Sequence, residues 1–67
     1  MDIEKEIRLA EADIADIMNR YNVASKDDLY DLIKSKKIPS HPVWEDYIVW
    51  KNKEKHINDL KARLDKI

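Results

Sequence analysis

The sequence predicts an all-α protein in which a long helix 1 and a long helix 3 form an antiparallel helical hairpin, with a short helix 2 between them. Apolar residues recur at steps of three and four over long stretches, as they do on one face of a helix. The chain contains no glycine, so the tight turns of β-hairpins lack their usual residue. Only two prolines occur, and both lie in one short segment, residues 38–42.

The first helix is expected at about residues 3–21. Asp2 can cap its start, and Asn22 can adopt the left-handed conformation that ends a helix. A rod of this length measures roughly 28 Å. Its apolar residues form a heptad seam of the coiled-coil kind: Ile3, Ile7, Ala10, Ile14, Ile17 and Tyr21.

The second helix is expected at about residues 26–36. Ser25 and Asp28 have the spacing of a capping box, with Asp in place of the usual Glu. Leu29, Leu32 and Ile33 then form one apolar face at helical spacing. We expect this helix to fold over the tryptophan-rich end of helix 3.

The third helix is expected at about residues 42–66, after the connector 38–42. The connector cannot be helical throughout, because each proline disfavours the helical region for the residue before it. Ser40 is expected to cap the helix and Pro42 to lie in its first turn. At roughly 37 Å, this helix is longer than helix 1. We therefore expect its tail to overhang helix 1, which exposes an apolar seam to a second copy or another protein: Ile57, Leu60, Leu64 and Ile67.

Length and composition set the class of the protein. Sixty-seven residues allow a single domain, residues 1–67, with a small core. The absence of cysteine excludes disulfides and thiolate metal sites. No apolar run approaches the roughly 20 residues of a membrane span, so we expect no membrane association and take the cytoplasm as the default compartment.

Charge is unevenly distributed along the chain. Residues 1–33 carry nine acids and four bases, and residues 34–67 carry five acids and nine bases. One interpretation is that two oppositely charged helices lie side by side. The other is that the basic third helix meets an acidic surface on a partner, or RNA. The net charge of −1 gives no general signature of nucleic-acid binding.

No group of residues has the spacing that catalysis or metal binding requires. His41 and His56 are 15 residues apart and have no cysteine near them. Without glycine, the chain cannot form a phosphate-binding loop. We expect neither an enzyme nor a bound metal or cofactor.

The candidate binding surface lies on the third helix. Its aromatic residues can form an ordinary small core, or a partly exposed cluster of the kind that dominates interface energetics. Trp44 and Trp50 point about 120° apart on an ideal helix, so each can serve one of these roles. The candidate residues, shared between core and interface, are Trp44, Tyr47, Trp50, Ile57, Leu60 and Leu64.

The middle of the chain, residues 21–50, resembles small archaeal and bacterial antitoxins, loosely the RelB-like group. The residues that carry the resemblance are Tyr21, the Ser25-Lys26-Asp27-Asp28-Leu29 segment, Ile38 and the run from His41 to Trp50. The resemblance implies a helical protein that wraps around a ribonuclease-type toxin and masks its active surface. The chain has no room for the separate DNA-binding module of many antitoxins.

The leading hypothesis is a helical module that sequesters a partner protein, which the resemblance suggests is a basic toxin. The alternative is a homo-oligomeric structural or adaptor protein whose seams meet copies of itself. A third hypothesis is an RNA-associated protein that uses the basic face of helix 3.

Overall fold

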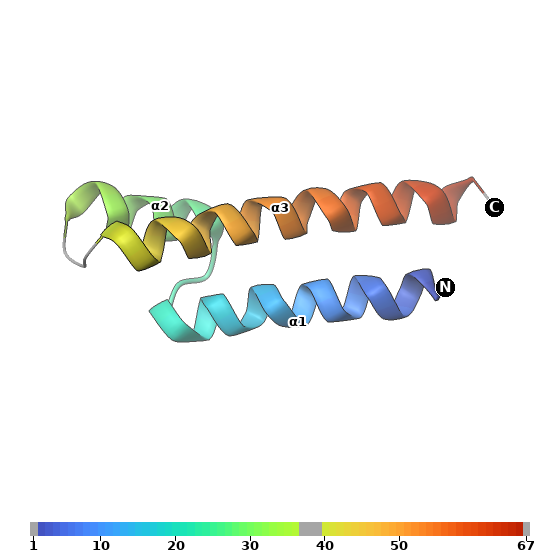
Figure 1. The fold of residues 1–67 in the computed structure, drawn as a ribbon, viewed down its shortest axis with the longest axis horizontal. Coiled ribbons are helices and arrows are strands. Elements are labelled where there is room, and N and C mark those ends of the chain that lie inside the picture. Colours follow the sequence, from blue (N-terminus) through green and yellow to red (C-terminus); the bar gives the residue numbers. More distant parts are fainter. Residues whose placement is uncertain (1, 37–39, 67) are drawn as a thin grey trace.

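A computed structural model describes residues 2–36 and 40–66, with the side chain of Ser40 excepted. These residues form three helices and no strand: α1 at Ile3–Tyr21, α2 at Lys26–Ser35 and α3 at Ser40–Asp65 (Figure 1). The all-α prediction is confirmed, with α1 and α3 packed together and α2 short between them. The expected roles of Ile38 and Pro39 in the connector, and of Ile67 in the seam, lie outside the described residues.

The helix ends follow from the capping residues. The Asp2 carboxylate accepts a hydrogen bond from the backbone N–H of Lys5 at 3.2 Å, and the Ser25 hydroxyl accepts one from that of Asp28 at 3.1 Å. Asn22 adopts φ 53° and ψ 50°, which turns the chain out of α1. These contacts satisfy backbone groups that have no partner inside a helix.

Two helix boundaries differ from the prediction. α2 ends at Ser35 because Lys36 adopts the left-handed conformation, with φ 59°, and caps the helix instead of extending it. α3 begins at Ser40, two residues earlier than expected. Pro42 is then the third residue of the first turn, where a missing N–H costs no hydrogen bond because first-turn N–H groups have no acceptor within the helix.

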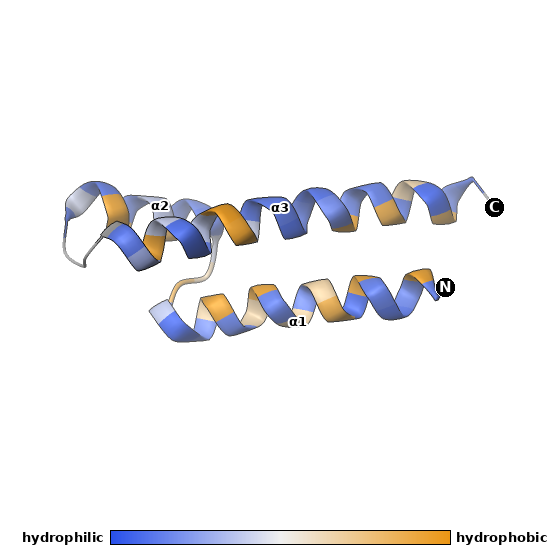
Figure 2. Ribbon diagram, viewed as in Figure 1, coloured by the Kyte–Doolittle hydropathy of each residue, from blue (hydrophilic) through white to orange (hydrophobic). Residues whose placement is uncertain are grey.

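The core lies between α1 and α3 and extends under α2. In Figure 2, the hydrophobic bands of α1 face those of the C-terminal half of α3. Leu29 of α2 and Trp50 of α3 are fully enclosed, with exposed fractions of 0% and 1%. The other buried residues of the described chain are Ile7, Ala10, Ile14, Ile17, Val43, Ile57 and Leu60. The result is an elongated molecule of 45 × 18 × 16 Å.

The expected overhang of the α3 tail is wrong for most of the seam. Ile57 and Leu60 are 7% and 1% exposed within the single chain. The reason is the register of the hairpin: Glu6 lies beside His56, so the first half of α1 covers this part of α3. Only the last turn of α3, which carries the half-buried Leu64, extends past the start of α1 (Figure 1). The surplus length at the other end of α3 packs against α2.

Opposite charges meet between α1 and the middle of α3. Lys53 pairs with Asp13 at 3.0 Å, and His56 lies 3.8 Å from Glu6. The interpretation of two oppositely charged helices side by side therefore accounts for part of the charge asymmetry. None of the helices, within the residues that the structure describes, is long and apolar enough to cross a membrane.

Candidate protein-interaction surface

The six candidate residues from the sequence separate into a core group and a surface group. Trp50, Ile57 and Leu60 are buried in the core, and Leu64 packs against it. Trp44 is 45% exposed, and Tyr47 beside it is half-buried. The structure thus divides the two tryptophans between core and surface, and only Trp44 and Tyr47 remain available at the surface as aromatic residues.

A third aromatic side chain, from α2, joins these two. The rings of Trp44 and Tyr47 stack with centroids 5.5 Å apart and planes inclined by 25°. The ring of Tyr30 lies 5.5 Å from that of Tyr47, inclined to it by 40°. We call Tyr30, Tyr47 and Trp44 the aromatic row. Tyr30 was not among the candidate residues, although its place on the helix expected to cover the tryptophan-rich end was a usable signal.

The aromatic row has an aliphatic and a cationic neighbour. Ile48, one helical turn after Trp44, is 40% exposed and enlarges the apolar surface. The Lys34 ammonium lies 5.6 Å from the centroid of the Tyr30 ring, within the range of a cation–π interaction. Val49, which follows Ile48 on α3, is also exposed, whereas the exposed Leu9 is on α1. Single exposed apolar residues are common on protein surfaces, whereas a contiguous apolar group is a candidate interaction site.

A carboxylate of α3 joins the start of α2 to the core residue Trp50. Glu54 accepts hydrogen bonds from the Trp50 indole N–H and from the Lys26 ammonium, each at 2.9 Å. The bond to Glu54 raises the pKa of Lys26, with partial burial acting in the opposite direction. Because Lys26 begins α2 and Trp50 is in the core, this arrangement sets the position of Tyr30 relative to Tyr47.

A second carboxylate of α3 fixes the end of α1. Asp46 accepts a hydrogen bond from the Arg20 guanidinium at 2.9 Å and another from the Tyr21 hydroxyl. Burial raises the pKa of the Tyr21 hydroxyl, and the hydrogen bond to Asp46 raises it further. The Asp46 bond likewise raises the pKa of Arg20. Asp46 and Glu54 together hold the two other helices against the aromatic half of α3.

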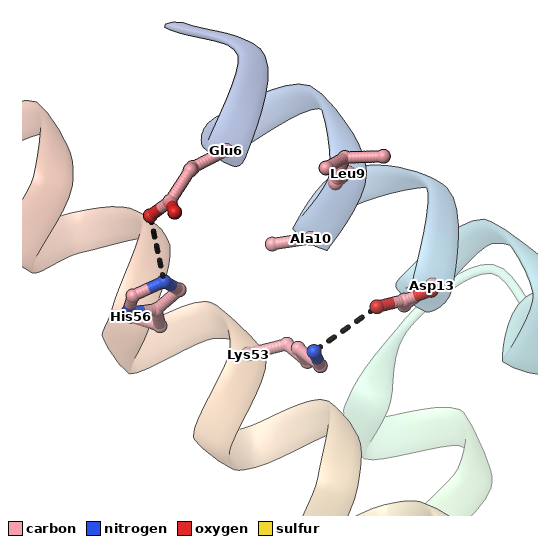
Figure 3. A pocket seen from close by; sticks show the side chains of 6 residues that line it. All are labelled: Glu6, Leu9, Ala10, Asp13, Lys53 and His56. Atoms are coloured by element: carbon pink, nitrogen blue, oxygen red, sulfur yellow. Dashed lines mark ion pairs between the residues drawn. The ribbon is translucent and has the colours of Figure 1, made fainter. Parts of the chain in front are cut away.

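A shallow hollow lies between α1 and α3, away from the aromatic row. It is lined by Glu6, Leu9, Ala10, Asp13, Lys53 and His56 (Figure 3). Its polar side chains point toward one another across the helices and form the Lys53–Asp13 ion pair and the contact between His56 and Glu6. Because these side chains already contact one another, the hollow is a poor candidate for a ligand site.

The metal-ligating side chains do not gather in the described part of the chain. Over residues 2–36 and 40–66, no group of three His, Asp or Glu side chains is placed to hold a metal ion. The Ser25 hydroxyl caps α2, and the Ser35 hydroxyl donates a hydrogen bond to the Leu32 carbonyl. His41 is exposed and 3.9 Å from Glu45 on its own helix. The aromatic row is therefore the strongest candidate functional feature of the molecule.

Comparison with known proteins places the chain in a family. The sequence matches the model of the uncharacterized protein MJ0235 family over residues 1–67, and the chain belongs to that family. Searches of curated proteins and of solved structures gave no match.

Proposed function

We propose that this member of the family is a helical protein-binding module that sequesters a partner protein through the aromatic row and Ile48. The observation that carries the proposal is that Trp44 is 45% exposed while its ring is stacked on Tyr47. Trp and Tyr are enriched among the few residues that dominate the binding energy of protein interfaces. A stacked ring also loses little side-chain freedom when a partner covers it, because its orientation is already fixed.

The contrast with Trp50 supports this proposal. A small core needs one large aromatic side chain under α2, and Trp50 meets that need at 1% exposure. Trp44 contributes less to the core, because nearly half of its surface stays in contact with water. An exposed indole beside an exposed Ile48 is a cost to solubility that a partner surface would offset.

The alternative, a homo-oligomer joined through its seams, has less support. The seam residues Ile7 and Ile14 of α1, and Ile57 and Leu60 of α3, are buried within one chain. A second copy would reach them only if the hairpin opened. Light scattering across a range of concentrations separates the two proposals, because a stable oligomer at every concentration would favour the alternative.

The resemblance to RelB-like antitoxins suggests a ribonuclease-type toxin as the partner, and we include this in the proposal. Trp44 and Tyr47 of the aromatic row belong to the segment that carries the resemblance. Binding would take place in the cytoplasm. Co-expression with the product of a neighbouring gene that encodes a small toxin-like protein tests the idea: growth arrest by that product should be relieved by the wild-type chain and not by Trp44→Ala.

A pull-down from native lysate with chemical cross-linking tests the binding function itself. The wild-type protein and the control Leu9→Ala should capture the same protein, and Trp44→Ala should lose it. Leu9 is a suitable control because it is 57% exposed, apolar and located on α1. Equal capture by all three proteins, or capture of nothing by the wild type, would reject the aromatic row as a binding surface.

A further inference from the structure

The outward face of α3 continues from the aromatic row into a row of lysines. Successive residues of a helix are about 100° apart, so Trp44, Ile48, Lys51 and Lys55 fall within an arc of about 60°. All four side chains are exposed. This stripe is about 17 Å long, because 11 residues separate its ends at about 1.5 Å each. We call Lys51 and Lys55 the lysine pair.

Glu54, the acidic residue next to the lysine pair in the sequence, binds residues elsewhere in the structure. The segment 51–55 contains one acid, Glu54, and a third lysine, Lys53, between Lys51 and Lys55. Glu54, however, turns toward α2, where it binds Lys26 and Trp50. Lys53 turns toward α1, where it pairs with Asp13. The outward face of the segment 51–55 therefore retains the two lysines, and the next exposed acid on that face is Asp59, one turn after Lys55.

Cations therefore flank the exposed aromatic surface at both ends. Lys34 of α2 lies over Tyr30 at one end, and the lysine pair follows Ile48 at the other. Within the described residues, no carboxylate oxygen lies within the 4.0 Å of an ion pair from the ammonium groups of Lys34, Lys51 and Lys55. Like charges one helical turn apart destabilise a helix slightly, so the lysine pair is a small cost to the isolated chain.

We infer that the aromatic row and the lysine pair form one docking surface for an acidic amphipathic helix of a partner protein. The inference rests on the proposed binding function and specifies the chemistry of the partner. Apolar side chains of such a helix would cover Trp44 and Ile48, as in other helix-in-groove complexes. Two carboxylates one turn apart would meet Lys51 and Lys55. A toxin that docked here would use an acidic segment, whatever its overall charge.

The geometry favours a protein partner over single-stranded RNA for this surface. Nucleic-acid platforms offer open ring faces on which bases stack. Here Trp44 stacks on Tyr47, Tyr30 lies against Tyr47, and Lys34 lies over the Tyr30 ring. Each of the three rings has an aromatic or cationic neighbour, so the row offers fewer open ring faces than such a platform.

Binding of three synthetic probes, followed by fluorescence anisotropy at low and at physiological salt, tests the inference. The probes are a helical peptide with a Leu and Phe stripe flanked by Glu, the same peptide with Lys in place of Glu, and an oligouridine. The acidic peptide should bind most tightly. The double variant Lys51→Glu/Lys55→Glu should weaken its binding roughly tenfold, mainly at low salt. The matched variant Lys5→Glu/Arg8→Glu, which makes the same charge change on the outer face of α1, should leave it unchanged.

The other outcomes separate this inference from the proposed function. Tighter binding of the basic peptide, with sensitivity to Trp44→Ala, would overturn the inferred charge of the partner and leave the binding function intact. Binding of oligouridine alone would overturn both. If neither peptide binds, the acidic-helix inference fails, and the cross-linking experiment with Trp44→Ala and Leu9→Ala decides the binding function separately.

Discussion

Replacing each tryptophan by alanine in turn tests the division between core and surface. Trp50 is 1% exposed and donates a hydrogen bond to Glu54, so Trp50→Ala should cost about 3–5 kcal/mol of folding free energy. Trp44 is 45% exposed, so Trp44→Ala should cost about 1 kcal/mol. A chain of 67 residues has a total stability of about 3–10 kcal/mol, at roughly 0.05–0.15 kcal/mol per residue. Trp50→Ala is therefore expected to lose roughly a third or more of the stability of the chain, and Trp44→Ala to stay close to the wild type.

Urea denaturation followed by circular dichroism measures both losses in the same assay. Trp50→Phe keeps the result quantitative if Trp50→Ala has no folded baseline. This variant removes the indole N–H and part of the ring, for a cost of about 1–2 kcal/mol, while Lys26 still satisfies the Glu54 carboxylate. Equal losses for Trp44→Ala and Trp50→Ala would refute the division and return Trp44 to the core.

Three further perturbations test the packing, the caps and the ionisable groups. Truncation after His56 removes the buried Ile57 and Leu60 and should abolish cooperative unfolding, since each such side chain contributes about 2–5 kcal/mol. Unchanged thermal melting would contradict the register of the hairpin. Ser25→Ala should cost about 1 kcal/mol of folding free energy through loss of the α2 cap. The control Ser35→Ala, at the other end of α2, should cost less. Equal losses of stability in urea denaturation would exclude a specific capping effect. Folding raises the pKa of Tyr21 and of Lys26, so the stability they contribute is complete below about pH 10 and declines as the pH rises through their raised values. Melting temperatures between about pH 9 and pH 11 should therefore fall, and fall less steeply for Tyr21→Phe; parallel curves would contradict the Tyr21 contribution.

The helices were predictable from the sequence because their signals are local. The steps of three and four in α1, and the caps Asp2, Asn22 and Ser25, act within one or two turns of the chain. The register of α1 against α3 is not a local property. Helix lengths alone suggested an overhanging tail, whereas contacts such as Glu6 with His56 align the first half of α1 with the C-terminal half of α3.

The binding surface was only partly predictable for the same reason. The angle of about 120° between Trp44 and Trp50 showed that the two indoles face different surroundings. It did not show which of the two indoles α2 would cover. The position of α2 depends on the burial of Leu29 and on the hydrogen bond from Lys26 to Glu54, and these contacts join residues that are distant in the sequence. Tyr30 enters the aromatic row only through this docking.

The lysines show how folding changes the meaning of a charge pattern. Read along the chain, Glu54 and Asp59 interrupt the lysines of α3 and indicate an ordinary solvated face. In three dimensions, Glu54 is drawn to Lys26 and Trp50, and the same bonds that fix α2 leave Lys51 and Lys55 on the outer face. A variant such as Glu54→Gln would weaken the hold on α2 and the aromatic row together. The stability of this small core and the shape of its candidate binding surface therefore depend on the same side chain.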